Sequence, residues 1–244
     1  MKARIRQLAL PFDPAPRFEP GDFIEAASNA EARAWLARTA DWPQGRLAVW
    51  GPAGCGKTHL LHGWALREGA EILRGPEIDP GLVPAPPTHP MAIDDAASVP
   101  EQALLHLINA AGEAGQPLLL AAEAPPGRWN VALPDLASRL RAITTAEIAA
   151  AEDDLLRLLL RRLLVERHLA VHETVQEFLL RRLPRTPAAL RLAAARLDQA
   201  AFSAHSPITR PLAAAALAGL LDAEEDDGLM TDAPAPSRPD RRVV

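Results

Sequence analysis

The residues of this chain that are best suited to chemistry form one glycine-rich loop. Residues 51–58 read Gly-Pro-Ala-Gly-Cys-Gly-Lys-Thr, which fits the pattern G-x-x-x-x-G-K-T. In such a loop the backbone N–H groups surround phosphate oxygens, the lysine reaches the β- and γ-phosphates, and the threonine hydroxyl ligates Mg²⁺. The residues expected to bind ADP or ATP are the eight of this loop and the histidine after it: Gly51, Pro52, Ala53, Gly54, Cys55, Gly56, Lys57, Thr58 and His59.

Lys57 stands out in the chain's use of positive charge. The only other lysine is Lys2, and the remaining members of the 26 basic residues are arginines. A compact ammonium fits between phosphates in a way that a planar guanidinium does not. Lys57 is therefore a specific requirement of the loop.

Two acidic residues are expected to complete a metal site. Asp94 and Asp95 come directly after the apolar residues 91–93, which predict the end of a buried strand. We expect Asp94 to hold Mg²⁺ through water together with Thr58, and Asp95 to orient an attacking water. Adjacent acids also occur at helix caps, but the upstream phosphate loop favours the metal site.

Two further side chains are candidates for a role beside the transferred phosphate. Glu123 follows the apolar run 116–122 and is the only polar residue there that could sense the γ-phosphate, although a neutral side chain is more usual. Arg139 lies near the end of 133–140 and could stabilise charge on a phosphoryl group, in cis or in trans. An ordinary surface arginine is the simpler interpretation of Arg139 when it is taken alone.

The elements that must position these residues alternate between strand and helix. Strands are expected at 46–50, 71–73, 91–93, 116–122 and 142–148, and helices at 59–66, 103–111 and 133–140. Ser28 or Asn29 is expected to cap an earlier helix that runs to about Arg38. This alternation predicts an α/β fold with a doubly wound parallel sheet.

Composition divides the chain into four segments. Residues 1–22 predict an extended arm because four prolines interrupt them, and 23–150 a nucleotide-binding α/β domain. Residues 151–221 predict a helical lid domain with helices over 152–166, 172–183, 186–201 and 209–221 and no strand between them. Residues 222–244 are acidic and then rich in proline, which predicts disorder.

Bulk properties narrow the classes of function. The net charge of −5 argues against a protein whose main affinity comes from neutralising DNA phosphates, although local basic patches remain open. A single cysteine, Cys55, excludes an internal disulfide and suits a reducing cytosol. We see no signal peptide or membrane span, and we expect a cytoplasmic protein without a membrane partner.

The order of these motifs resembles the AAA+ module, a P-loop NTPase fold with a parallel-sheet αβα domain and a small helical lid. The segments 23–29, 56–61 and 93–95 are similar to the bacterial replication initiator DnaA, and the resemblance covers about 18–221. That initiator carries an N-terminal interaction domain and a C-terminal DNA-binding domain, for which this chain has no room.

The arm adds a second resemblance. Residues 7–12 read Gln-Leu-Ala-Leu-Pro-Phe, which is similar to the short motif by which replication proteins bind the β sliding clamp. A glutamine amide and apolar anchors on an extended segment suit an apolar groove. The residues expected to bind the clamp are Gln7, Leu8, Leu10, Pro11 and Phe12. With the initiator-like module, this architecture resembles the Hda family.

The resemblance implies a negative regulator of DNA replication initiation. Bound to the DNA polymerase III β sliding clamp, and so reaching DNA indirectly at the replisome, the protein would present Arg139 to ATP-bound DnaA and stimulate its ATP hydrolysis. Its own site would hold ADP or ATP with Mg²⁺ and have weak or no ATPase activity. Self-association is left open.

The lid departs from the family pattern. Families of this type place an arginine early in the third lid helix, where it contacts the γ-phosphate, but the matching position here is Ala188. Arg185 and Arg191 each lie about one turn away, and either or neither could reach the nucleotide. Loss of this contact would weaken hydrolysis by the protein itself.

Two other classes of function are open. One is an autonomous AAA+ ATPase such as a helicase loader, which would act on a helicase and single-stranded DNA; the clamp-like arm argues against it. The other is a P-loop kinase, for which the sequence shows no region that would bind a phosphate acceptor.

Overall fold

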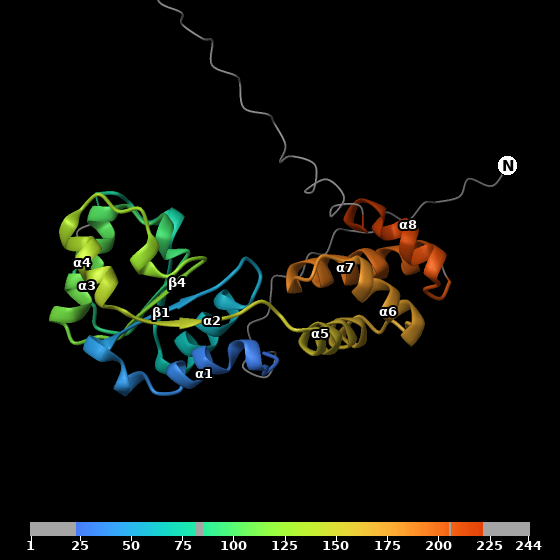
Figure 1. Cartoon of the computed structure of the whole chain (residues 1–244), viewed down its shortest axis with the longest axis horizontal. Coiled ribbons are helices and arrows are strands. Elements are labelled where there is room, and N and C mark those ends of the chain that lie inside the picture. Colours follow the sequence, from blue (N-terminus) through green and yellow to red (C-terminus); the bar gives the residue numbers. More distant parts are fainter. Residues whose placement is uncertain (1–22, 82–84, 205, 222–244) are drawn as a thin grey trace, which may run out of the picture. The chain divides into compact units, whose positions relative to one another are not determined.

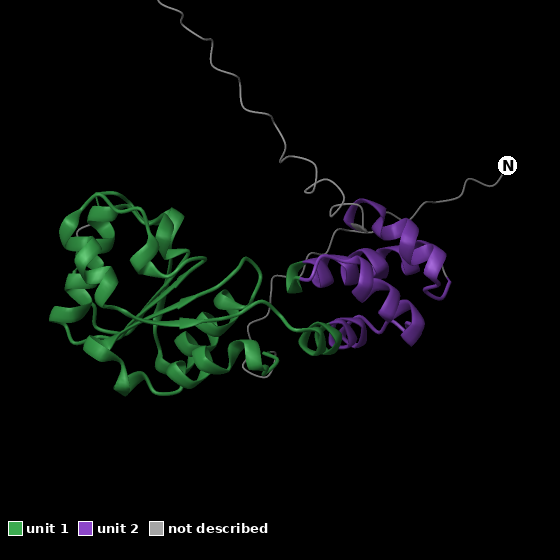
Figure 2. Cartoon of the chain, viewed as in Figure 1, with its two compact units in different colours: residues 1–159, 186–188 green, residues 160–185, 189–244 purple. Residues whose placement is uncertain are grey.

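The chain forms two compact units in a computed structural model that describes residues 23–81, 85–204 and 206–221 (Figures 1 and 2). Unit 1 contains the described residues up to Leu159 together with Thr186–Ala188, and unit 2 contains the others. The expected arm, 1–22, and the expected tail, 222–244, lie outside the described residues.

Unit 1 is built on a five-stranded sheet in which every pairing is parallel. The strand order is β2-β3-β4-β1-β5. The strands are β1 Arg46–Trp50, β2 Glu71–Arg74, β3 Met91–Asp94, β4 Leu118–Ala122 and β5 Thr144–Glu147. Trp50 aligns with Ala122 and with Glu147. The loops that follow β1, β4 and β5 therefore emerge at one edge of the sheet.

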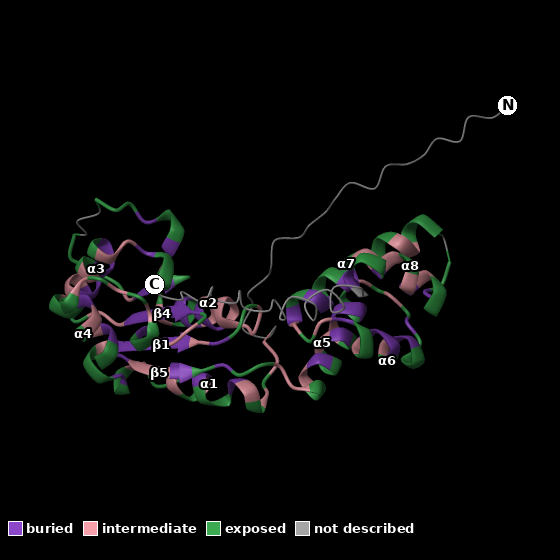
Figure 3. Cartoon of the chain, turned by 45° about the horizontal axis from the view of Figure 1, so that its top comes forward, coloured by how far each residue is buried: buried purple, intermediate pink, exposed green. Residues whose placement is uncertain are grey.

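Helices cover both faces of this sheet. They are α1 Ala30–Leu36, α2 Lys57–Glu68, α3 Glu101–Glu113 and α4 Pro134–Ala142. One buried core joins residues of α1 and α2 to the sheet, and the other joins α3 and α4 to its opposite face. Leu118 and Leu120 of β4 belong to the second core and Leu119 to the first, because successive side chains of a strand point to opposite faces. Figure 3 shows the resulting buried strands. The predicted α/β fold is confirmed.

Unit 2 is helical in the residues that the structure describes. Helix α5 Asp153–Glu166 runs from unit 1 into unit 2 and is followed by α6 Glu173–Arg182, α7 Pro187–Ala204 and α8 Arg210–Leu221. Its one β-type contact is an isolated bridge between Val171 and Ile208. Leucines such as Leu160, Leu179 and Leu197 are fully buried, so an aliphatic core holds the helices together.

Asn29 differs from its expected role as a side-chain cap of α1. Its Oδ1 accepts a hydrogen bond from Ala26 N at 3.2 Å, and its Nδ2 donates to Ile24 O at 3.0 Å. The side chain therefore holds the turn before the helix and makes no cap bond to the helix itself. The helix ends at Leu36, two residues before the expected limit.

None of the helices in the described part of the chain has both the length and the apolar character that a membrane crossing needs.

Candidate nucleotide-binding site

The glycine-rich loop lies at the carboxyl edge of the sheet, between β1 and α2. Gly51 N donates to Ala122 O of β4 at 3.3 Å, and Ile148 N donates to Trp50 O at 2.7 Å. These bonds fasten the start of the loop to the ends of the two neighbouring strands. The loop then opens into α2, whose unpaired N–H groups and dipole favour an anion.

Two of the loop glycines are required by geometry. A Cβ on Gly51 would lie 2.1 Å from Ile148 O, so the backbone approach leaves no space for a side chain. Gly56 has φ +109° and precedes the first residue of α2, a backbone conformation that favours glycine. The loop can therefore curl only with these residue types.

Lys57 is held on the loop itself. Its Nζ donates to Gly51 O at 2.7 Å and to Pro52 O at 2.9 Å. The ammonium thus lies beside the backbone groups that would surround phosphate oxygens. There its positive charge would offset the negative charge of the phosphate.

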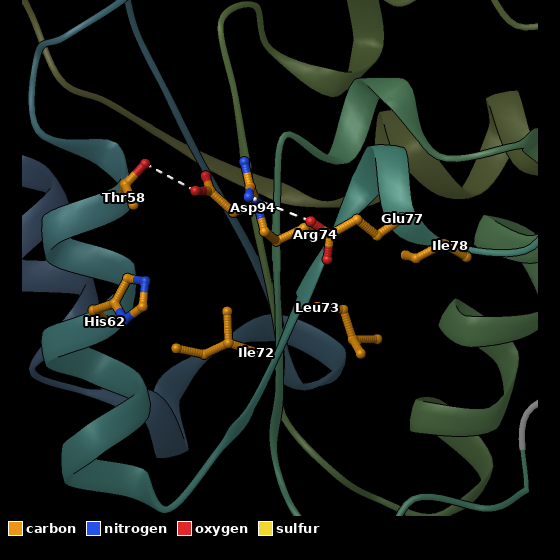
Figure 4. A pocket seen from close by; sticks show the side chains of 8 residues that line it. All are labelled: Thr58, His62, Ile72, Leu73, Arg74, Glu77, Ile78 and Asp94. Atoms are coloured by element: carbon orange, nitrogen blue, oxygen red, sulfur yellow. Dashed lines mark hydrogen bonds and ion pairs between the residues drawn. The ribbon is translucent and has the colours of Figure 1, made fainter. Parts of the chain in front are cut away.

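The two residues expected to hold Mg²⁺ are in contact. Thr58 Oγ1 donates to Asp94 Oδ2 at 2.8 Å (Figure 4). The described residues contain no group of three or more His, Cys, Asp or Glu that could hold a metal by itself. A magnesium ion at Thr58 and Asp94 would therefore take its other ligands from nucleotide phosphates and water, which is the usual arrangement for this ion.

Asp95 has a left-handed backbone conformation, with φ +54°. Its N–H donates to Asp94 Oδ1 at 3.2 Å, and its side chain is exposed. The conformation is uncommon for a residue other than glycine and marks a candidate functional position. Gly75, at the end of β2, packs directly against it: a Cβ there would lie 2.1 Å from Asp95 O.

A cavity of about 730 Å³ adjoins the Thr58–Asp94 pair (Figure 4). Its wall includes His62, one turn after Thr58 on α2, and Arg74, which forms an ion pair with Glu77 at 3.3 Å. Burial lowers the pKa of His62, and the charge of Asp94 acts in the opposite direction. Sequence reasoning missed these three residues, although the four-residue spacing of Thr58 and His62 places both on one helix face.

Cys55 and Glu123 lie close enough to interact electrostatically. Burial raises the pKa of the Cys55 thiol, the charge of Lys57 opposes this shift, and Glu123 adds to it. Glu123 is exposed just beyond the end of β4. Its carboxylate therefore lies near the loop, as a sensor would, but its role toward a phosphate stays a prediction.

The segment before α1 contacts the start of α2. The Phe23 ring lies 5.3 Å from the His59 ring, measured between centroids. Farther along, the Glu152 carboxylate accepts from Ala27 N at 2.9 Å and from Ser28 N at 3.3 Å. These hydrogen bonds, with one from the Ser28 side chain as the main cause, lower the pKa of Glu152. Phe23 and His59 are thus positioned beside the loop.

Arg139 is on α4, which ends at Ala142 just before β5 begins at Thr144 beside Leu47, so it lies near the amino edge of the sheet, opposite to the loop. Burial, and then the charge of Arg139, lower the pKa of Arg46, so the two guanidinium groups are close enough to repel. Arg46 is the first residue of β1, and the loop follows the last, Trp50. The strand rises about 13 Å between them. The structure therefore separates Arg139 from Asp95, the other residue expected to be catalytic.

The lid residues differ in the unit to which they belong. Ala188 is part of unit 1, where a Cβ built on Gly54 would lie 3.5 Å from the Ala188 methyl group. Arg185 and Arg191 belong to unit 2, and their contact with a nucleotide stays a prediction. The expected clamp-binding residues, Gln7 to Phe12, lie outside the described residues.

This chain has the AAA+ fold, in which a P-loop lies at the carboxyl edge of a five-stranded parallel sheet. No family model matches the sequence. Domain III of the replication initiation protein DnaA from Thermotoga maritima has a TM-score of 0.70 at 16% identity, over 85% of this chain and 98% of that one.

Two other solved structures have the same fold. A variant of RuvB from Thermotoga maritima has a TM-score of 0.62 at 19% identity, over 80% of this chain and 70% of that one. AMPPCP-bound DnaA from Aquifex aeolicus has a TM-score of 0.54 at 15% identity, over 69% of this chain and 61% of that one. At these identities the likeness concerns the fold.

Proposed function

We propose that this protein is an Hda-like negative regulator of replication initiation. It binds an adenine nucleotide, docks on the β sliding clamp, and stimulates ATP hydrolysis by a DnaA-type initiator. The fold likeness to DnaA domain III supports the pairing of two similar modules. The product of the reaction is an ADP-bound initiator that does not restart replication.

The observation that carries this proposal is the position of Arg139. Its Nε donates to Asp135 Oδ1 at 3.2 Å, and its side chain is 37% exposed. Within the described residues this is the one hydrogen bond that Arg139 makes, so both terminal amino groups remain available for phosphate oxygens. Because the chain's own loop is at the opposite sheet edge, a phosphate that Arg139 stabilises belongs to another molecule.

The protein's own nucleotide then acts mainly as a structural ligand. In this proposal Lys57 binds the phosphates, and Thr58 and Asp94 hold Mg²⁺; the support is that Lys57 is held on the loop and that Thr58 donates to Asp94. A ligand that binds only the folded state stabilises it by an amount that grows with its concentration over Kd. We propose that ADP or ATP, held with Mg²⁺, stabilises the module that presents Arg139.

The arm supplies the clamp contact in this proposal. Replacing Gln7, Leu10 and Phe12 together by alanine should abolish retention on immobilised β clamp while nucleotide affinity stays unchanged. The reason is that a groove-bound segment depends on a few side-chain anchors. Full retention of the triple variant would show that the arm does not bind the clamp.

The role of Arg139 as an arginine finger, a side chain that stabilises the transferred phosphoryl group of a neighbouring molecule, is tested by Arg139→Ala beside a matched control, Arg141→Ala. Arg141 is on the same helix and exposed, so the control removes the same charge. We expect Arg139→Ala to keep clamp retention and lose stimulation of initiator ATP hydrolysis, because a finger in related systems contributes about 10³–10⁵ in rate. Arg141→Ala should stimulate like wild type. Equal stimulation by both variants contradicts the assignment.

An autonomous ATPase, such as a helicase loader, is the second candidate. The observation in its favour is the exposed carboxylate of Asp95 next to the Thr58–Asp94 pair, where it could orient an attacking water. Steady-state hydrolysis by the protein alone discriminates the two. A substantial rate that Asp95→Asn removes favours the autonomous enzyme, and a negligible rate favours the regulator.

A further inference from the structure

We propose that unit 2 carries a direct binding face for the phosphate backbone of nucleic acid, formed by Arg182 and Arg210 around Phe178. We call these three residues the arginine face. The inference goes beyond the proposed function, in which DNA is reached through the clamp. Its test needs neither the clamp nor the initiator.

The arginine face joins two helices. Arg182 is the last residue of α6, and Arg210 is the first residue of α8. Their guanidinium carbons lie 5.5 Å and 4.6 Å from the centroid of the Phe178 ring, which is 6% exposed. The two cations are therefore no more than about 10 Å apart, the sum of these distances, and both side chains are exposed. Contact with the ring orients each guanidinium before any ligand arrives.

The charge around this face is not balanced. The described part of unit 2 contains nine arginines and four acidic residues, although the whole chain has a net charge of −5. Glu173 and Glu166 are already paired, with Arg161 at 3.0 Å and Arg162 at 2.8 Å. The remaining acids are Glu177 and Asp198.

Neither cation of the arginine face has an acidic partner among the described residues. Arg182 and Arg210 make no ion pair there, and ring contact with Phe178 is their common interaction. The nearest acid along α6 is Glu177, which is four residues before Arg181 and so shares a helix face with that residue. The face thus holds two like charges within about a Debye length of each other.

A polyanion relieves this repulsion better than a single small anion. A nucleic acid carries one charge per nucleotide along a continuous backbone, so it can meet both cations at once. Each guanidinium can also bind two oxygens of one phosphate. Such contacts are independent of sequence, because they read the backbone and not the bases. A local basic patch of this kind is compatible with the negative net charge of the whole chain.

The predicted strength follows from counterion release. On duplex DNA each phosphate contact contributes about 0.9 to the slope of log K against log salt. Removing the two contacts should therefore reduce the magnitude of the slope by about 1.8. Over a fourfold rise in salt this corresponds to roughly a twelvefold smaller loss of affinity in the variant than in wild type.

The test is fluorescence anisotropy of a labelled DNA duplex of arbitrary sequence, titrated with the full chain at several salt concentrations. Arg182→Gln with Arg210→Gln should bind weakly and show the smaller slope. The matched control is Arg161→Gln with Arg162→Gln, which removes the same charge from the same unit at arginines that are already ion-paired. The control should keep nearly the wild-type slope.

Lysine variants separate charge from packing. Arg182→Lys with Arg210→Lys should keep the wild-type slope, because the charges remain, even if weaker ring contact lowers the thermal stability. Should the glutamine double variant not fold, Arg210→Gln alone should reduce the slope by about 0.9.

Three results would overturn the proposal. One is a wild-type slope in the folded glutamine variant, and another is an equal loss in the control. The third is duplex binding that appears only after residues 222–244 are removed. That result would mean that in the full chain the arginine face binds the chain's own acidic segment and not nucleic acid.

Discussion

Gly75→Ala should weaken magnesium-dependent nucleotide binding although Gly75 lies outside the glycine-rich loop. A Cβ at this position would lie 2.1 Å from Asp95 O, 3.0 Å from Asp95 C and 3.3 Å from Asp94 O. Ordinary contacts begin at 3.4 Å, so the backbone of the acid pair or the end of β2 must move by about 1.3 Å. Overpacking of this kind costs about 1–3 kcal/mol in stability.

The displacement acts on the metal side of the site. Asp94 is fixed by its 2.8 Å hydrogen bond from Thr58, and Mg²⁺ requires near-ideal octahedral distances. A misplacement of 1 Å can cost a factor of about 10² at a catalytic site. We therefore expect the affinity for Mg²⁺–nucleotide to fall roughly ten- to a hundred-fold, while binding in EDTA changes little.

Calorimetric titration with ADP and ATP, with Mg²⁺ or with EDTA, measures both quantities. The matched control is Gly63→Ala on α2, where a Cβ would meet no atom within 4 Å. That variant should bind like wild type and gain about 0.5–1 kcal/mol, because alanine favours a helix interior over glycine. If Gly75→Ala folds and its nucleotide affinity depends on magnesium as that of the control does, the contact between Gly75 and Asp95 does not position the metal site.

Three further predictions concern single side chains. Lys57→Ala should strongly reduce affinity for ADP and ATP in a calorimetric titration, because it removes the cation held at Gly51 and Pro52, and wild-type affinity would contradict the site. Hydrogen bonds, first of all one from the Ser28 side chain, lower the pKa of Glu152, so its stabilisation is present at neutral pH and is lost as the pH falls through that lowered pKa. Glu152→Gln should therefore lower the Tm near pH 7, and the difference from wild type should shrink steadily as the pH is lowered into the acid range. A Tm difference that stays the same at every pH would exclude this linkage. Burial raises the pKa of Cys55, so alkylation near pH 7 should be slower than for free cysteine, and an equal rate would show that the thiol is not protected.

Local sequence patterns were sufficient to predict the strands and helices of the fold and, within the site, the P-loop and the two acids. The uninterrupted apolar run of β4 indicated a strand buried on both faces, and Leu118 and Leu119 do enter opposite cores. The P-loop and the two acids at the end of β3 could also be placed from sequence, because each lies at the carboxyl end of a strand and these ends reach the same sheet edge. Parallel topology then brings Thr58 and Asp94 together.

The remaining features depend on contacts between distant parts of the chain. Arg46 of β1 and Arg139 of α4 are close enough to repel each other, although they are far apart in the sequence. Local sequence patterns cannot predict such a contact. The approach of Gly75 to Asp95 requires β2 and β3 to be paired in register. Of the two predicted caps, Ser28 or Asn29, Asn29 does directly precede α1, but it makes no side-chain cap bond because its amide bonds to residues before the helix. The arginine face likewise arises only when α6 and α8 pack together.

The most direct test of the account is a single-turnover measurement of hydrolysis in trans. Initiator preloaded with radiolabelled ATP is mixed with clamp on DNA and with this protein preloaded with unlabelled ADP, so that all labelled phosphate released comes from the initiator. We expect fast release with wild type and with Arg141→Ala, and release at the unstimulated rate with Arg139→Ala. Stimulation by Arg139→Ala equal to that by wild type, or no stimulation by wild type, would show that Arg139 does not promote hydrolysis in the initiator.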